Sequence, residues 1–109
     1  MSEASAAKVA EGTAEGLREI AARGWPDDDG VYGWLEGVLD VRRTYSSDGT
    51  LYGVLLLVGF GGPNVWLDFV PNGCEVRVSW WSDEARVWVP CPEVAEQVIE
   101  ALDFWSVQR

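Results

Sequence analysis

The stretch that decides the fold is residues 65–81, which read VWLDFVPNGCEVRVSWW. Apolar and polar side chains alternate on both sides of Asn72-Gly73, and a period of two is typical of half-buried strands. Asn-Gly is a strong signal for a two-residue hairpin loop, so we expect Pro71 to pair with Cys74. This register predicts one apolar face, made of Val65, Leu67, Phe69, Cys74, Val76, Val78 and Trp80.

Two further turn signals extend the sheet outward from this hairpin. Asp83-Glu84 predicts that Ser82 pairs with Ala85, which adds Val87 and Val89 to the apolar face. Asp48-Gly49 predicts that Ser47 pairs with Thr50, which adds Tyr52, Val54, Leu56, Val58 and Phe60. The five predicted strands are Val38–Tyr45, Thr50–Phe60, Val65–Val70, Cys74–Trp81 and Ala85–Val89, while Val31–Gly37 is either an extra strand or an irregular entry.

Helical periodicity flanks the predicted strands. In residues 5–23, apolar residues recur at steps of three and four, and Gly24 and Pro26 end the pattern. Gly12 and Gly16 either permit close packing on the sheet or leave this helix weak. The stripes are Ala6, Val9, Thr13, Leu17 and Ile20 in the first helix, and Val94, Val98, Leu102 and Trp105 in a second helix that starts at Pro92. We therefore predict one α+β domain over residues 1–109, an α-β-β-β-β-β-α chain whose five-stranded antiparallel meander carries both helices on its apolar face.

Composition narrows the classes of function. The chain has 109 residues, 18 Asp and Glu against 8 Lys and Arg, a formal net charge of −10 and no histidine. Histidine-dependent catalytic triads and metal sites are excluded, and we expect neither an enzyme nor a cofactor or metal. Such a charge repels nucleic acid and anionic membranes and favours basic protein partners. The alternative is that acidity only keeps a Trp-rich protein soluble.

The strand alternation also predicts a second sheet face that mixes tryptophan with charge. Trp66, Trp81 and Trp88 fall on it beside Arg42, Arg77 and Arg86. Large aromatic rings next to arginine are typical of interaction hot spots. The competing interpretation is that the rings lie flat on the arginine side chains and are partly covered by the first helix.

Carboxylates on the terminal helices are the second set of candidate partner-binding residues. Acids at steps of three and four share one helix face, about 5 to 6 Å apart, which is comparable to the spacing of backbone phosphates. The alternative is a solvated outer face. The candidates are Glu93, Glu96, Glu100 and Asp103 in the last helix, Glu11, Glu15 and Glu19 in the first, and Asp27, Asp28 and Asp29 in the turn.

Three segments carry a family resemblance: SDGTLYG (residues 47–53), GGPNVWLD (61–68) and VSWW (78–81). Over about a third of the chain they resemble small acidic accessory proteins of phages and mobile elements, of the anti-CRISPR or antirestriction type. The resemblance implies a stoichiometric inhibitor in the host cytoplasm that mimics nucleic acid on a CRISPR effector or restriction complex. One alternative is a self-associating module, a homodimer in which the Trp-bearing faces of two copies pack together. The other is an immunity protein against a basic toxin nuclease.

Overall fold

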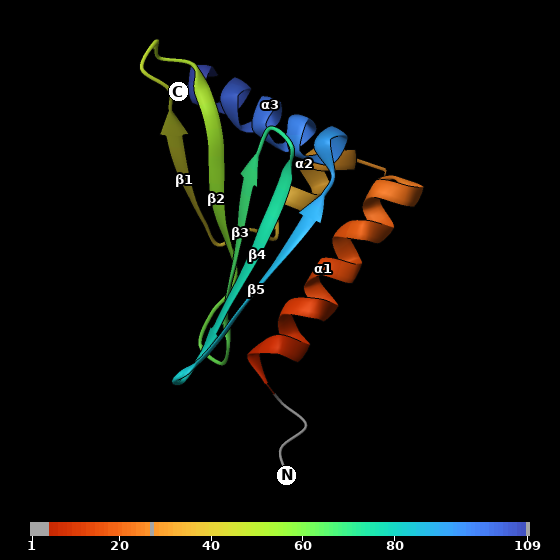
Figure 1. Cartoon of the computed structure of the whole chain (residues 1–109). Coiled ribbons are helices and arrows are strands. Elements are labelled where there is room, and N and C mark those ends of the chain that lie inside the picture. Colours follow the sequence, from red (N-terminus) through yellow and green to blue (C-terminus); the bar gives the residue numbers. More distant parts are fainter. Residues whose placement is uncertain (1–4, 27, 109) are drawn as a thin grey trace.

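The computed structural model describes residues 5–26 and 28–108, with the backbone alone for 105–108. It has the predicted α+β architecture, with one short helix added (Figure 1). The elements are α1 (Ala6–Arg23), α2 (Gly30–Leu35), β1 (Asp40–Tyr45), β2 (Leu51–Gly59), β3 (Asn64–Val70), β4 (Gly73–Trp80), β5 (Asp83–Pro90) and α3 (Pro92–Gln108).

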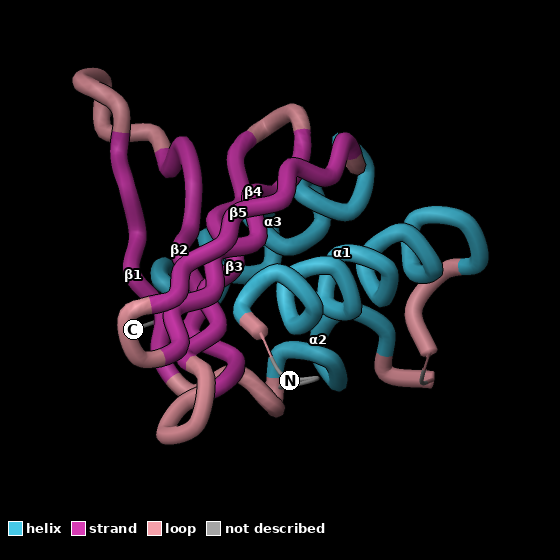
Figure 2. Tube along the Cα trace, turned by 60° about the horizontal axis from the view of Figure 1, so that its bottom comes forward, coloured by secondary structure: helices cyan, strands magenta, loops and turns pink. Residues whose placement is uncertain are grey.

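The five strands form one antiparallel meander in the order β1-β2-β3-β4-β5. All three helices lie on the same side of the sheet, as Figures 1 and 2 show from two directions. Helix α1 packs on β4 and β5, whereas α3 crosses β2, β3 and β4. The core is therefore a single layer between the helices and one sheet face, and no described element covers the other face.

The central hairpin has the predicted faces but a different register. Val70 pairs with Gly73, so the loop is Pro71-Asn72 and β4 slides by two residues relative to the prediction. Gly73 lies in the strand, at a point where the sheet is too tightly packed for a side chain. An added Cβ would lie 2.3 Å from the backbone oxygen of Val89. An even slip keeps every side chain on its face. Of the residues expected inside, Val65, Leu67, Phe69, Cys74, Val76 and Val78 are buried and Trp80 is partly buried.

The next hairpin slips further, again by an even number. Trp80 pairs with Asp83, so the loop is Trp81-Ser82 instead of Asp83-Glu84. The Asp83 carboxylate accepts a hydrogen bond of 2.9 Å from the backbone N–H of Ala6, which ties β5 to the first turn of α1. The prediction that Trp81 lies on the outer sheet face is wrong, because the slip moves it into the turn.

The β1–β2 hairpin has the predicted register from Asp40 to Thr44, and it becomes irregular next to the turn. The register shift skips Tyr52, which is half-exposed, and Leu51 is buried instead, so the predicted place of Tyr52 on the apolar face is wrong. Gly49 adopts a positive φ of 88° in this turn. Hydrogen bonds from the Ser46 hydroxyl and the Thr50 N–H lower the pKa of Asp48 to about 2. At the other end of β2 the register shifts, the strand stops at Gly59, and Phe60 is exposed, so its predicted place in the core is wrong.

Helix α1 buries smaller side chains than the periodicity predicted. Its buried residues are Ala6, Ala10, Ala14 and Leu17, while Val9, Thr13 and Ile20 are only half-buried. Alanine lets the helix axis lie close to the edge of the sheet. Nothing lies within 4 Å of a Cβ added at Gly12 or Gly16. Packing therefore does not require these glycines, and they leave the helix weak.

Residues Gly30–Leu35 form α2, so neither the extra strand nor the irregular entry is correct. Leu35 is buried, and Trp34 meets Phe69 edge-on with ring centroids 6.2 Å apart. Trp25 packs against Trp34 at 5.4 Å. Tertiary packing of these rings overrides the strand propensity of Val, Tyr and Trp in this segment.

Candidate functional site

Helix α3 presents a continuous row of carboxylates on its exposed side. The opposite side buries Val94, Val98 and Leu102 in the core, as the periodicity predicted, whereas the predicted Trp105 side chain lies outside the described residues. Steps of three and four place the acids on one face. Within the described part of the chain, no basic side chain forms an ion pair with any of them. We call these four residues the acidic ridge: Glu93, Glu96, Glu100 and Asp103.

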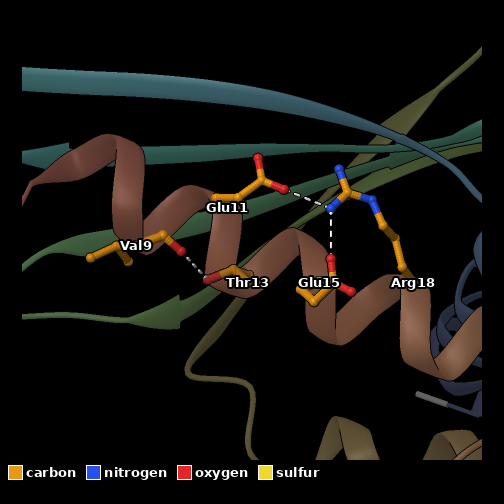
Figure 3. A network of polar contacts seen from close by, with 5 residues as sticks. All are labelled: Val9, Glu11, Thr13, Glu15 and Arg18. Carbon is orange, nitrogen blue, oxygen red and sulfur yellow. Dashed lines mark hydrogen bonds and ion pairs between the residues drawn. The ribbon is translucent and has the colours of Figure 1, made fainter.

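The acids of α1 have a different environment. Arg18 Nη1 lies 2.6 Å from a carboxylate oxygen of Glu11 and 3.0 Å from one of Glu15 (Figure 3). These hydrogen bonds raise the pKa of Arg18. Glu19 pairs with Arg23 at 3.5 Å. The predicted acidic face of α1 is thus largely balanced by its own arginines, whereas the acidic ridge is not.

A groove of about 430 Å³ runs beside the acidic ridge, between α3 and the end of the β1–β2 hairpin. Glu93, Glu96 and Glu100 line one side of it. A groove with apolar walls and an acidic rim suits a side chain that has an aliphatic stem and a cationic head. Helical spacing predicted the acids but not the rest of the groove, because its opposite wall comes from distant segments: Ser46, Thr50, Leu51, Tyr52 and Pro71. Pro92 and Ile99 of α3 complete the lining.

The acidic turn before α2 lies next to the same helix. Asp28 is exposed, and Asp29 lines a hollow of about 540 Å³ together with Glu100. Trp25 Nε1 donates a 2.8 Å hydrogen bond to Gln97 Oε1, which holds this segment against α3. The structure therefore brings part of the turn to the acidic ridge. Asp27, which was also predicted to bind a partner, lies outside the described residues.

The uncovered sheet face is the second candidate surface. Trp66 and Trp88 lie on it as predicted, with Trp88 47% exposed. Trp81 stands apart at the tip of the β4–β5 hairpin, where it is 92% exposed and adopts a positive φ of 57°. Helix α1 does not cover this face, so that part of the competing interpretation is wrong.

The charges of this face are paired with one another. Arg77 lies 2.7 Å from both Asp68 and Glu75, and the hydrogen bond that Arg77 donates to Glu75 contributes most to raising the pKa of Arg77. The guanidinium of Arg42 lies over the Trp66 ring, 5.5 Å from its centroid. One ring is thus stacked under an arginine, as the competing interpretation expected.

An apolar cavity of about 680 Å³ lies between α1, α2 and the sheet. Trp25 and Trp34 line it with Leu17 and Val58, and Glu19 and Arg23 stand at its rim. The sequence pattern does not predict this cavity, because α2 forms one of its walls and the pattern of residues 31–37 does not indicate a helix.

Both cysteines, Cys74 and Cys91, are free and buried. Burial raises the pKa of both the Cys74 and the Cys91 thiols. Their thiolates, the reactive form, are therefore disfavoured.

Comparison with protein-family models, curated proteins and solved structures finds no match to this chain. In the described ranges, 5–26 and 28–108, no group of three or more Cys, Asp or Glu is placed to hold a metal ion. None of the described helices has the length and apolar character needed to cross a membrane.

Proposed function

We propose that the chain is a stoichiometric inhibitor of the anti-CRISPR or antirestriction type. It acts in the host cytoplasm, where the acidic ridge occupies a basic nucleic-acid-binding surface of a defence complex. The observation that carries this proposal is the contrast between the helices. The α1 acids lie beside arginines, whereas the four acids of α3 line an exposed face with no described basic partner.

The acidic ridge costs the isolated protein free energy. Like charges one helical turn apart repel by a few tenths of a kcal/mol per pair, and a lysine at i+4 would relieve this. A basic partner relieves it too, and the long-range attraction accelerates the encounter. The neighbouring groove adds an apolar contact for the stem of a lysine or arginine. These features support a partner surface rich in basic residues.

The test uses the immobilised full chain and a nuclease-treated bacterial lysate that contains CRISPR effectors and restriction enzymes. We expect the wild type to retain nucleic-acid-binding proteins at low salt, to release them at high salt, and to release them when duplex DNA is added. A variant with Glu93→Gln, Glu96→Gln, Glu100→Gln and Asp103→Asn should retain at least about tenfold less, because charge-assisted contacts are lost.

The matched control removes the same number of charges elsewhere, through Glu11→Gln, Glu15→Gln, Glu19→Gln and Glu84→Gln. This variant has the same net charge as the ridge variant, so it should retain the captured proteins nearly as well as the wild type. Equal loss in both variants would show that net charge and not the acidic ridge drives binding. Capture that DNA does not displace would overturn the proposed nucleic-acid mimicry, and a captured toxin nuclease would make the chain an immunity protein.

A further inference from the structure

The uncovered sheet face carries two rows of side chains that run across all five strands. Strand pairing aligns each row, since directly opposed residues point to the same side of the sheet. The first row is Arg42, Leu55, Asp68, Glu75 and Trp88. The second row is Asp40, Leu57, Trp66, Arg77 and Arg86.

Each strand contributes one residue to each row. In a second copy with reversed strands, the residue that a strand contributes to one row would lie opposite the residue that the same strand contributes to the other row. On β1 the pair is Asp40 and Arg42, and on β4 it is Arg77 and Glu75. Each of these two strands therefore carries one negative and one positive side chain, two residues apart, on the uncovered face. A second copy with reversed strands would meet each carboxylate with a guanidinium.

The other strands follow the same rule. Strand β2 offers Leu57 and Leu55, which would meet as an apolar pair. On β5, the guanidinium of one copy would lie over the Trp88 ring of the other, in a cation–π contact. On β3, Trp66 of one copy would lie opposite Asp68 of the other, so the indole N–H would have a carboxylate as its acceptor.

The charge balance of the face points to the same partner. Three arginines and three carboxylates occupy the two rows, so these rows are neutral, although the chain has a net charge of −10. Glu84 lies on the same face but outside the two rows. A basic partner would gain nothing here from long-range attraction. A surface that is neutral and self-complementary about a two-fold axis fits another copy of itself.

We propose that this face is the interface of a symmetric homodimer. Its two-fold axis lies parallel to the sheets, perpendicular to the strands and between the two rows. Aligned sheet packing, with strand directions within about 30°, brings corresponding strands of the two copies over one another. Helix α3, which carries the acidic ridge, lies on the other side of each sheet (Figure 1), so the dimer leaves both ridges outside the interface.

The size of the face sets the expected affinity. Five strands about 4.8 Å apart and about seven residues long give a footprint of roughly 500 Å² per copy. Specific interfaces bury about 600 Å² or more per partner. The dimer is therefore weak, with a dissociation constant in the micromolar range.

The test is sedimentation equilibrium of the full chain as its concentration is raised through the micromolar range. We expect the mass to approach twice the 12.0 kDa of one chain. Leu55→Glu alone and Leu57→Lys alone should each weaken association by about tenfold or more, because a charge is buried against an apolar partner. An equimolar mixture of these two variants should associate again, since the two-fold axis sets the introduced carboxylate opposite the introduced ammonium.

Trp81→Asn is the matched control, because this exposed tryptophan lies outside the face, and it should associate like the wild type. Circular dichroism checks that each variant is folded. If both leucine variants unfold, Trp88→Ala on the edge strand replaces them and should weaken association. A wild type that stays monomeric, a mixture that does not associate, or a control weakened equally would overturn the dimer. The ridge variant should still dimerise, so this result is independent of the proposed inhibition.

Discussion

At the scale of single residues, Trp81 combines high exposure with an unfavourable backbone conformation. Its ring is almost fully exposed, and its backbone adopts the left-handed conformation at the first position of a two-residue hairpin loop. Such loops need a positive φ there and usually use glycine, asparagine or aspartate. The left-handed conformation costs a non-glycine residue about 1 to 2 kcal/mol. A tryptophan at this position weakens the fold and packs against little.

Trp81→Gly should therefore raise the free energy of unfolding by roughly 0.5 to 1 kcal/mol. The relief of strain exceeds the entropy that glycine adds to the unfolded chain. Chemical denaturation with urea measures the change. Trp88→Gly in the adjoining strand, where no positive φ is needed, serves as the comparison and should lower stability. Destabilisation by Trp81→Gly would mean that the exposed ring makes contacts that compensate for the strain.

At the scale of elements, the glycines of helix α1 and the glycine at the start of strand β4 have different roles. Gly12 and Gly16 interrupt α1 at positions where a methyl group would meet nothing. A methyl group at Gly73 would meet the backbone of β5 and the N–H of Cys91, 3.0 Å away. The sequence pattern alone does not separate glycines required by packing from glycines that weaken an element, because the difference depends on what lies opposite each of them.

We expect Gly12→Ala and Gly16→Ala each to raise the free energy of unfolding by about 1 kcal/mol, the difference in helix propensity between the two residues. The increments should add, because both positions are exposed. Gly73→Ala should lower it by about 2 kcal/mol or more, because the strands must separate. The denaturation midpoints of the three variants measure these changes, provided that the slope of the unfolding free energy against denaturant concentration stays the same. A destabilising Gly12→Ala would show that this part of α1 packs more tightly than the structure indicates.

At the scale of the whole molecule, charge is distributed unevenly between the surfaces. The two rows of the uncovered sheet face are neutral and α1 is largely balanced by its arginines, so much of the unbalanced negative charge lies on α3 and the nearby turn. The molecule measures 48 × 31 × 23 Å. At about 10 mM salt the Debye length is about 30 Å, so charges across the whole fold repel, whereas at about 0.15 M it is about 8 Å.

Added salt should therefore stabilise the protein, with the melting temperature rising by about 2 to 5 °C between these two ionic strengths. The four-residue ridge variant should show a smaller rise, because it lacks a large share of the repelling groups. Calorimetry at constant pH measures both, on a sample dilute enough to be monomeric. The control variant with Glu11, Glu15, Glu19 and Glu84 replaced frees Arg18 and Arg23 from their ion pairs. If its salt-induced rise in melting temperature were reduced as much as that of the ridge variant, repulsion would be spread evenly over the surface.

The sequence by itself determined the α+β class, the meander, and the face on which nearly every strand residue lies. Strand alternation has a period of two, so hairpins that slip by two or four residues leave the faces unchanged. It also determined the acidic ridge, because helical spacing alone places those four acids together.

Only the tertiary structure decided the position of Trp81, the existence of α2, and the far wall of the groove beside the acidic ridge. Each of these depends on contacts between segments far apart in the chain, such as Asp83 with the start of α1 and Trp34 with Phe69. Local periodicity carries no information about such contacts. They depend on how the helices pack on the sheet, and that packing is a property of the whole fold.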